Sequence, residues 1–222
     1  MLTRVATSTL ALVLCCFFSS CTNKSTQITQ QFQYHDDGIA KPRIAMVPVY
    51  NNSKANIQWS LSDELTEAFS ERIYQSGSFY LTKDFDMLGV QRFPLHEINP
   101  FLDDIDWLAE VDSGTDFIVF LELVSHNLAP NGNNLKLFQS YSLDMSMRIK
   151  VVDIRQKKPT VILHEMVEET YSVPWGFTNF AYQKGRWNKT AFSYSPIGVA
   201  HSKMVKRVAK QVEDYILLAK MH

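Results

Sequence analysis

Histidine and acidic side chains are the residues of this sequence that could bind a metal ion or transfer protons. His126 follows an apolar segment, His164 and Glu165 are adjacent in a later one, and His201 lies in a segment of helical periodicity. No two of these histidines have the spacing of metal ligands on one element. We therefore expect surface histidines or histidines satisfied in the core, with no metal ion and no cofactor. An enzyme would need a cleft that gathers His126, His201 and a carboxylate.

The sequence contains none of the common catalytic motifs. G-x-S-x-G, S-x-x-K and H-E-x-x-H are absent, and so are the P-loop and G-x-G-x-x-G. Acidic residues cluster between positions 103 and 112, but they lack the alternating ligands and the glycine of a calcium loop. Those at the start of a predicted helix favour its dipole instead. We predict that the protein is not an enzyme.

Composition and charge exclude several classes of protein. The 222 residues are 45% hydrophobic and 12% aromatic, with a formal net charge of -1. These are ordinary globular values, which exclude a wholly disordered, collagen-like or coiled-coil chain. No stripe of Lys and Arg dominates, so we expect no nucleic-acid partner.

The N-terminal segment has the pattern of a bacterial export signal. Arg4 supplies the positive charge, and residues 5–18 form a mostly apolar stretch that is short for a membrane-spanning helix. Phe18-Ser19-Ser20-Cys21 resembles a lipobox, although Leu is commoner than Phe at its first position. The resemblance implies cleavage before Cys21, a lipid on its sulfur and acylation of the new N-terminus with a chain such as palmitate. Several acyl chains anchor a protein stably. A plain secretory signal with a chance cysteine is the alternative.

The distribution of cysteine agrees with a lipoprotein. Cys15, Cys16 and Cys21 are the only cysteines, so the rest of the chain has no disulfide and no thiolate nucleophile. Asn23 would be the second residue of the mature chain. By resemblance to enterobacterial sorting, this residue favours the outer membrane, with the domain facing the periplasm.

The chain divides into three parts in our interpretation. Residues 1–20 are the signal peptide, residues 21–41 are the lipidated cysteine and a polar tether, and residues 42–222 form one α/β domain. As a flexible coil, the tether spans roughly 25 Å, which would keep the domain near the membrane surface.

Hydrophobic periodicity predicts a three-layer-like domain with a mixed central sheet, a C-terminal β-hairpin and a long C-terminal helix. A capping box of Ser60 and Asp63 and a stop at Gly77 bound one helix. The first half of the domain is predicted to contain a strand at 43–50, a helix at 61–76, a strand at 79–82 and a helix at 101–111. The inward residues of that last helix are Phe101, Leu102, Ile105, Leu108 and Ala109. There follow a buried strand at 117–124, a polar loop at 127–134, an alternating strand at 142–152, its hairpin partner at 161–170, and a helix at 197–221.

Several of these segments carry a family resemblance. The stretch IAMVPVYNNS, a helix ending in SG, the strand SFYLTKD and the strand GTDFIVFLELV resemble a group of bacterial envelope domains. The group comprises the N-terminal domain of TolB, the curli-secretion channel lipoprotein CsgG and the penicillin-binding-protein activator LpoB. Gly114 and Asp116 match the Gly-x-Asp turn before the third strand, and Asn51 matches the usual position after Pro48. The resemblance covers residues 43 to about 170 and again the final helix. It implies a fold and carries over no catalytic residue.

The insertion at residues 171–196 is the unusual part of the sequence. Eight of the 24 residues from 171 to 194 are aromatic, and basic residues lie among them. Three interpretations stay open: a loop that buries its own rings, a partner-binding surface, and contact with the membrane interface. As partner-binding candidates we take Trp175, Phe177, Phe180, Tyr182, Lys184, Arg186 and Trp187.

These observations favour a non-catalytic, lipid-anchored envelope protein that scaffolds or activates an assembly machine through protein–protein contacts. The resemblance to penicillin-binding-protein activators suggests peptidoglycan synthesis. Those activators have long disordered arms, however, and this tether is too short to cross the cell wall, so we expect a partner near the outer membrane. The alternative is a component of a secretion or export channel that forms a homo-oligomer.

Overall fold

The computed structural model describes residues 32–82, 99–102, 104–110, 114–131, 140–177, 187 and 189–221. No helix within these ranges is both long and apolar enough to cross a membrane. The predicted signal peptide, Cys21 and the tether up to residue 31 lie outside the described residues. So do four of the partner-binding candidates: Phe180, Tyr182, Lys184 and Arg186.

A six-stranded mixed sheet forms the centre of the fold, as predicted. Its order is β3-β1-β4-β5-β6, and β2 also pairs with β4. β1 is parallel to both β3 and β4, whereas β4, β5 and β6 run antiparallel. The strands are β1 (Arg43–Met46), β2 (Tyr50–Asn51), β3 (Tyr80–Leu81), β4 (Phe117–Asn131), β5 (Ser140–Asp153) and β6 (Thr160–Pro174).

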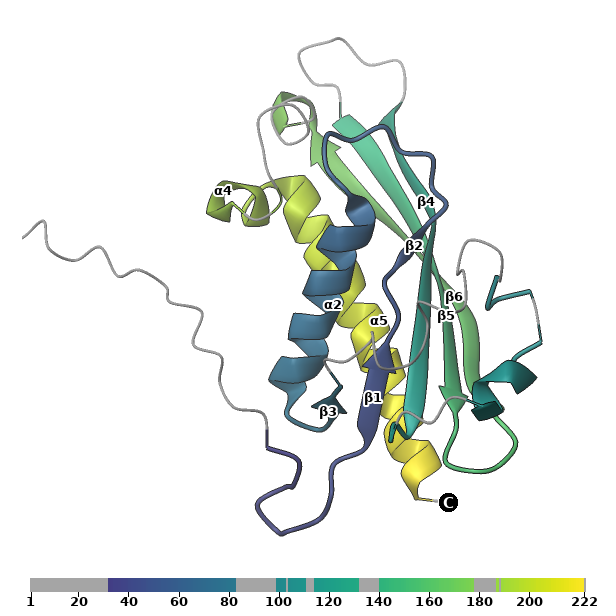
Figure 1. The fold of residues 1–222 in the computed structure, drawn as a ribbon. Helices are drawn as coiled ribbons and strands as arrows, with labels where there is room; N and C mark the ends of the chain where they lie inside the picture. The colour runs from purple at the N-terminus through teal and green to yellow at the C-terminus, as the bar shows by residue number, and fades with distance from the viewer. Residues whose placement is uncertain are drawn as a thin grey trace, which may run out of the picture. The chain divides into compact units, whose positions relative to one another are not determined.

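Two long helices cover one face of this sheet (Figure 1). α2 (Leu61–Ser76) begins where the Ser60 hydroxyl accepts a hydrogen bond from the Asp63 N–H, and it ends at Gly77 with a φ of 70°. Both ends agree with the capping signals in the sequence. α5 (Pro196–Lys220) is capped by Ser195, and the single turn α4 (Thr190–Ser193) precedes it.

The main core lies between the sheet and these two helices. The residues of β5 that face α2 and α5 are buried, which confirms the alternation predicted for this strand: Leu143, Met145, Met147, Ile149 and Val151. A smaller core covers the other face, where Phe101, Ile105 and Leu108 pack on Ile118 and Phe120 of β4. β4 is therefore buried on both faces over its first half, as its apolar sequence predicts.

The prediction of a helix at residues 101–111 is wrong. The described part of this segment is a turn followed by the 3-10 helix η3 (Asp106–Glu110), and both Leu102 and Ala109 are exposed instead of facing inward. Asn99 Oδ1 accepts from the Phe101 N–H and Asp104 Oδ1 accepts from the Asp106 N–H. Such local side-chain bonds compete with a regular helix.

Strand boundaries also differ from the prediction. β4 continues to Asn131, so the start of the predicted polar loop at 127–134 is paired with β5. β6 continues to Pro174 at its C-terminal end. The predicted first strand is instead two strands, because Pro48 has no N–H to donate and separates β1 from β2.

The N-terminal end of the described chain is tied to the C-terminal helix. Tyr34 and Ala40 form an isolated antiparallel bridge. Lys220 Nζ, at the end of α5, donates a 2.8 Å hydrogen bond to the Ala40 carbonyl. The chain therefore enters the domain beside the C-terminal end of α5. A separate short helix, η5 (Trp175–Phe177), follows β6.

Candidate functional site

Four side chains form a continuous polar chain through the core. Trp59 Nε1 donates to Glu64 Oε2 at 2.7 Å, and Glu64 Oε1 lies 2.6 Å from His201 Nδ1. His201 Nε2 in turn lies 2.9 Å from His126 Nε2. Glu64, His126 and His201 are each less than 7% exposed. The structure thus brings together the two histidines and a carboxylate. In the sequence, His126 is 75 residues from His201 and Glu64 is 137 residues from His201.

Local structure explains how three elements reach this point. Glu64 lies in the first turn of α2, where a carboxylate favours the helix dipole, and His201 lies in the second turn of α5. A β-bulge between Leu123 and Ser125 shifts the register of β4. Because side chains alternate along a strand, this extra residue turns His126 toward the helices, opposite Met145 of β5.

The electrostatics of the cluster are those of a buried site. Burial first, and then the charge of the neighbouring His201, lower the pKa of His126 to about 3. A ring with this pKa does not act as a general base near neutral pH. Both ring nitrogens of His201 already have partners.

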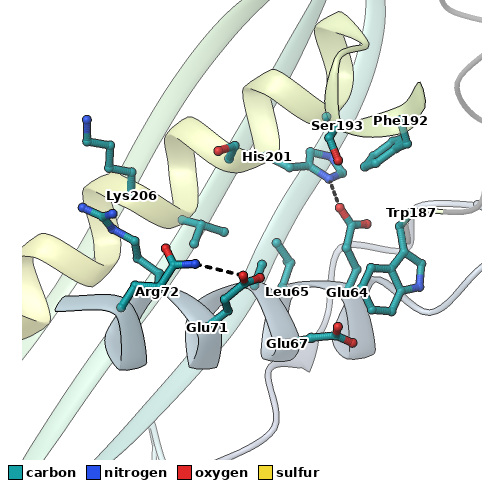
Figure 2. Close-up of a pocket in the computed structure, with 15 residues that line it drawn as sticks. Glu64, Leu65, Glu67, Glu71, Arg72, Trp187, Phe192, Ser193, His201 and Lys206 are labelled. Carbon is teal, nitrogen blue, oxygen red and sulfur yellow. Dashed lines mark hydrogen bonds and ion pairs between the residues drawn. The ribbon is translucent and has the colours of Figure 1, made fainter. Parts of the chain in front are cut away.

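A groove of about 510 Å³ opens above this cluster, between α2 and α5 (Figure 2). Its apolar lining includes Leu65, Val205 and Phe192. Glu64 of α2 and His201 of α5 also line it and point toward each other (Figure 2). Charged residues on the exposed helix faces border it, with Glu67 and Glu71 from α2 and with Arg72 and Lys206 toward one end. The groove therefore has an apolar floor and both acidic and basic side chains at its border.

The wall of the groove at α4 depends on one glycine. A Cβ atom added to Gly198 would overlap the carbonyl oxygen of Phe192. Phe192 packs edge-on against Trp59, with ring centroids 5.3 Å apart, and against His201 at 5.7 Å. Gly198 thus lets the α4 turn approach α5 closely enough to close the polar cluster with an aromatic ring.

The structure separates the partner-binding candidates that it describes. Trp187 is half-buried, packs against the main core and lines the groove. Trp175 in η5 is 53% exposed and is not among the residues that line the groove. Phe177 ends the same short helix. Of the described partner-binding candidates, Trp187 therefore lines the groove, as does Phe192 of the same aromatic segment, and the role of the other candidates stays a prediction.

The residues that carried the family resemblance hold strands together. The Arg43 N–H donates to Asp116 Oδ2 at 2.8 Å, and Arg43 Nη1 donates to the Gly114 carbonyl at 2.8 Å. Gly114 has a φ of 57°, a conformation that favours glycine. Asn51 Oδ1 accepts from the Ser53 N–H and closes the turn after β2. These residues have a structural role, as a resemblance in fold implies.

Sequence reasoning named His126 and His201 but missed Glu64 and the groove. A buried Glu in the first turn of an amphipathic helix looks like a dipole-favouring surface carboxylate, and the bulge that turns His126 inward has no glycine to mark it. Within the described ranges, no group of three or more His, Cys, Asp and Glu residues could hold a metal ion.

Comparison with known proteins gives one family and several similar folds. Residues 30–220 match DUF7499, a family of unknown function. The hypothetical protein CT253 from Chlamydia trachomatis is 25% identical, with a TM-score of 0.59 over 80% of this chain and 98% of that one. No curated protein matches the sequence.

Solved structures with lower similarity include bacterial lipoproteins. Lipoprotein GNA1162 from Neisseria meningitidis is 13% identical, with a TM-score of 0.39 over 76% of this chain and 99% of that one. The LpoB C-terminal domain from Salmonella enterica is 15% identical, with a TM-score of 0.34 over 60% of this chain and 86% of that one. These comparisons do not single out one of the three families that the sequence resembles.

Proposed function

Because the chain belongs to DUF7499, a family of unknown function, we propose its role from its own residues and geometry. We propose that it is a non-catalytic lipoprotein of the bacterial outer membrane, anchored through Cys21, with its α/β domain in the periplasm. The domain binds a protein of an envelope assembly machine as a scaffold or activator.

The observation that carries this proposal is the groove between α2 and α5, to which the aromatic segment contributes Trp187. An apolar floor bordered by acidic and basic side chains suits a peptide segment that carries an apolar anchor and both kinds of charge. Trp175 of the same aromatic segment is more than half exposed but does not line the groove. The occupant we propose is therefore a segment of a protein partner.

A structural role for the polar cluster supports the non-catalytic part of the proposal. The Glu64 carboxylate accepts hydrogen bonds from Trp59 and His201, and His201 has its second nitrogen against His126. A general base must have a nitrogen available for the proton that it abstracts. The ring nitrogens of His201 in this cluster are instead engaged in contacts that join α5 to α2 and β4.

The anchor is tested by lipid labelling and mass spectrometry of the exported protein. We expect a chain that begins at a triacylated Cys21 and incorporates labelled palmitate, and a Cys21→Ser chain that loses the label and the outer-membrane fraction. A mature chain with an unmodified cysteine would contradict the proposed anchor.

The partner surface is tested by cross-linking in cells and quantitative comparison of captured proteins. Trp187→Ala with Glu71→Lys should lower capture of one specific envelope protein at least tenfold, and Trp175→Ala should lower it less. Tyr50→Ala is the matched control, because Tyr50 is also an exposed aromatic residue, 51% accessible, but lies on β2 away from the groove. Equal capture by the groove variant and the control overturns the proposal.

The size of the lipidated protein separates this role from a channel component. β6 lies at one edge of the sheet and exposes Val161 and Met166, which are 38% and 42% accessible. An exposed strand edge can pair with another copy. A scaffold should be a monomer or dimer in detergent by mass photometry. A closed ring would instead support the export-channel alternative.

A further inference from the structure

Exposed apolar side chains gather where the described chain enters the domain. Of the twelve large hydrophobic residues that are exposed in the described ranges, five belong to residues 32–41 and to the C-terminal end of α5: Phe32, Tyr34, Ile39, Leu218 and Met221. Their exposed fractions are 54% to 81%. The Tyr34–Ala40 bridge and the bond from Lys220 Nζ to the Ala40 carbonyl hold these two segments side by side. Single exposed apolar residues need no explanation, but five at one end of a domain indicate a surface that makes contacts.

The turn between β5 and β6 brings positive charge to the same end of the domain (Figure 1). Arg155 Nη2 donates a 2.9 Å hydrogen bond to the Ala219 carbonyl, which holds the turn beside the end of α5. We call residues 32–41, 155–158 and 218–221 the entry surface. These segments contain five basic and two acidic residues, whereas the whole chain contains 22 and 23. Arg155 is paired with Asp153. The local surplus of positive charge therefore comes from lysines: Lys41, Lys157, Lys158 and Lys220.

The length of chain before the described residues limits how far this surface can lie from a lipid at Cys21. Cys21 and Phe32 are eleven positions apart. At no more than about 3.6 Å per residue, the segment between them spans at most roughly 40 Å in any conformation. The proposed anchor would therefore keep the entry surface within reach of the bilayer.

We propose that the entry surface rests on an anionic phospholipid bilayer, with its lysines against lipid phosphates and its apolar side chains among the headgroups. Lysines near a membrane attract negatively charged lipids, and aromatic side chains such as Tyr34 settle at the membrane interface. A lipid anchor and a basic surface act together in stable membrane binding. This inference rests on the proposed function in one respect, because the anchor at Cys21 would bring the surface to the membrane.

This contact would turn the other end of the sheet away from the bilayer. β6 runs from Thr160, next to the basic turn, to Pro174, and a strand of this length spans about 45 Å at 3.3 Å per residue. Trp175 follows at the far end. Membrane contact was one of the three interpretations of the aromatic segment. The entry surface and Trp175 cannot both lie on one flat bilayer with β6 upright, so the two can be tested against each other.

Vesicle flotation of the chain from position 21 onward, with Cys21→Ser, tests the surface without the lipid. Residues 32–222 form one compact unit, so this chain contains the whole domain. We expect it to float with vesicles of an equal mixture of phosphatidylglycerol and phosphatidylcholine, and not with phosphatidylcholine alone. Lys157→Gln with Lys158→Gln should lower binding at least about tenfold, since each lysine near an anionic surface contributes about fivefold. Leu218→Ser with Met221→Ser should lower it severalfold.

Lys54→Gln with Lys203→Gln is the matched control for the charge. It removes the same charge from two exposed lysines that lie before α2 and near the start of α5. Its effect should stay below about twofold, because residue 203 is about 25 Å along α5 from residue 220, beyond the screening length of about 8 Å at physiological salt. Equal losses from the two pairs of lysines, or no binding to the anionic vesicles, overturn the proposal.

A label on one side chain shows which end of the domain meets the bilayer. Because no cysteine lies beyond position 21, Met221→Cys or Trp175→Cys in the Cys21→Ser chain provides a single thiol for a fluorescent label. Lipids with a nitroxide on the headgroup should quench the label at position 221 and leave the label at position 175 unquenched. Stronger quenching at position 175 would assign the membrane contact to the aromatic segment and overturn the proposal.

Mass photometry distinguishes the bilayer from a second copy of the chain. A dimer that Leu218→Ser with Met221→Ser abolishes, in a chain that does not bind vesicles, would make the entry surface an interface between copies and overturn the proposal. The anchor is judged separately. Vesicle binding by the Cys21→Ser chain, with an unmodified cysteine in the exported protein, refutes only the proposed anchor. A triacylated Cys21 on a domain that does not bind vesicles refutes only this inference.

Discussion

The Asp116 carboxylate accepts a hydrogen bond from the backbone N–H of Arg43, 73 residues earlier in the chain, at 2.8 Å. The backbone repeats the contact in the other direction, because the Asp116 N–H donates to the Arg43 carbonyl. Together these bonds fix the start of β1 beside β4. The aspartate that family resemblance marked is therefore a clamp between two parallel strands.

Replacing this clamp should lower stability. We expect Asp116→Ala to reduce the free energy of unfolding by about 1–2 kcal/mol, because the Arg43 N–H loses a charged acceptor. Asp116→Asn should lose less, since the amide oxygen still accepts. Urea unfolding measures both, with Asp214→Ala as a control, because the Asp214 side chain is 57% exposed at the surface of α5. Equal stability of Asp116→Ala and the control would refute the clamp.

Gly198 should tolerate no side chain. Gly198→Ala drives a methyl group into the Phe192 carbonyl, and we expect a loss of at least about 2 kcal/mol because backbone must move. The displacement should also disturb the contact between the Phe192 and Trp59 rings, which tryptophan fluorescence can follow. Gly176→Ala is the matched control, since a Cβ there meets nothing within 4 Å. If the two variants unfold at the same urea concentration, the close packing of α4 on α5 does not limit stability.

Stability should fall in acid because of His126. Its pKa is about 3 in the folded protein against an ordinary 6.5, so the unfolded state binds more protons between these values. The stabilisation is full above pH 6.5 and is lost as pH falls toward 3, by on the order of 4 kcal/mol. The free energy of unfolding, measured with urea between pH 7 and pH 4, should therefore fall less steeply with decreasing pH in His126→Gln than in the wild type. An unchanged slope, with His164→Gln as the control, would contradict the prediction.

The opposite face of the sheet holds a second buried charge. Glu122 accepts from Asn52 Nδ2 at 3.1 Å, and Arg148 Nη1 lies 3.0 Å from its other oxygen without the alignment of a hydrogen bond. Arg148→Met should cost about 2 kcal/mol, less than a fully buried pair because the arginine reaches solvent. Adding Glu122→Gln should recover most of the loss, which a double-mutant cycle measures. An additive cycle would show that the two side chains do not interact.

Periodicity and capping predicted the regular part of this fold well. Helix 61–76 was predicted with its observed ends because Ser60, Asp63 and Gly77 mark both of them, and β5 was predicted from strict alternation. The helix predicted at 101–111 was wrong because the apolar residues of this segment have helical spacing, whereas the side chains of Asn99 and Asp104 accept hydrogen bonds from the local backbone. Periodicity reports which side chains are buried, and it does not report competing hydrogen bonds.

The candidate site was predictable only in its parts. His126 and His201 are visible in the sequence, but their meeting depends on a bulge in β4 and on the packing of α5 across it. Glu64 has the appearance of a surface residue at a helix N-terminus. Contacts between residues so distant in the chain follow from tertiary packing, which no local pattern encodes.

The bond between Lys220 and Ala40 has a consequence for how the protein would be held at a membrane. The groove lies along the first half of α5, whose residue 206 is about 21 Å from residue 220 at 1.5 Å per residue. The described chain therefore enters the domain at the end of α5 that is remote from the groove. A force applied through the N-terminal segment would reach the Lys220–Ala40 contact before it reached the groove.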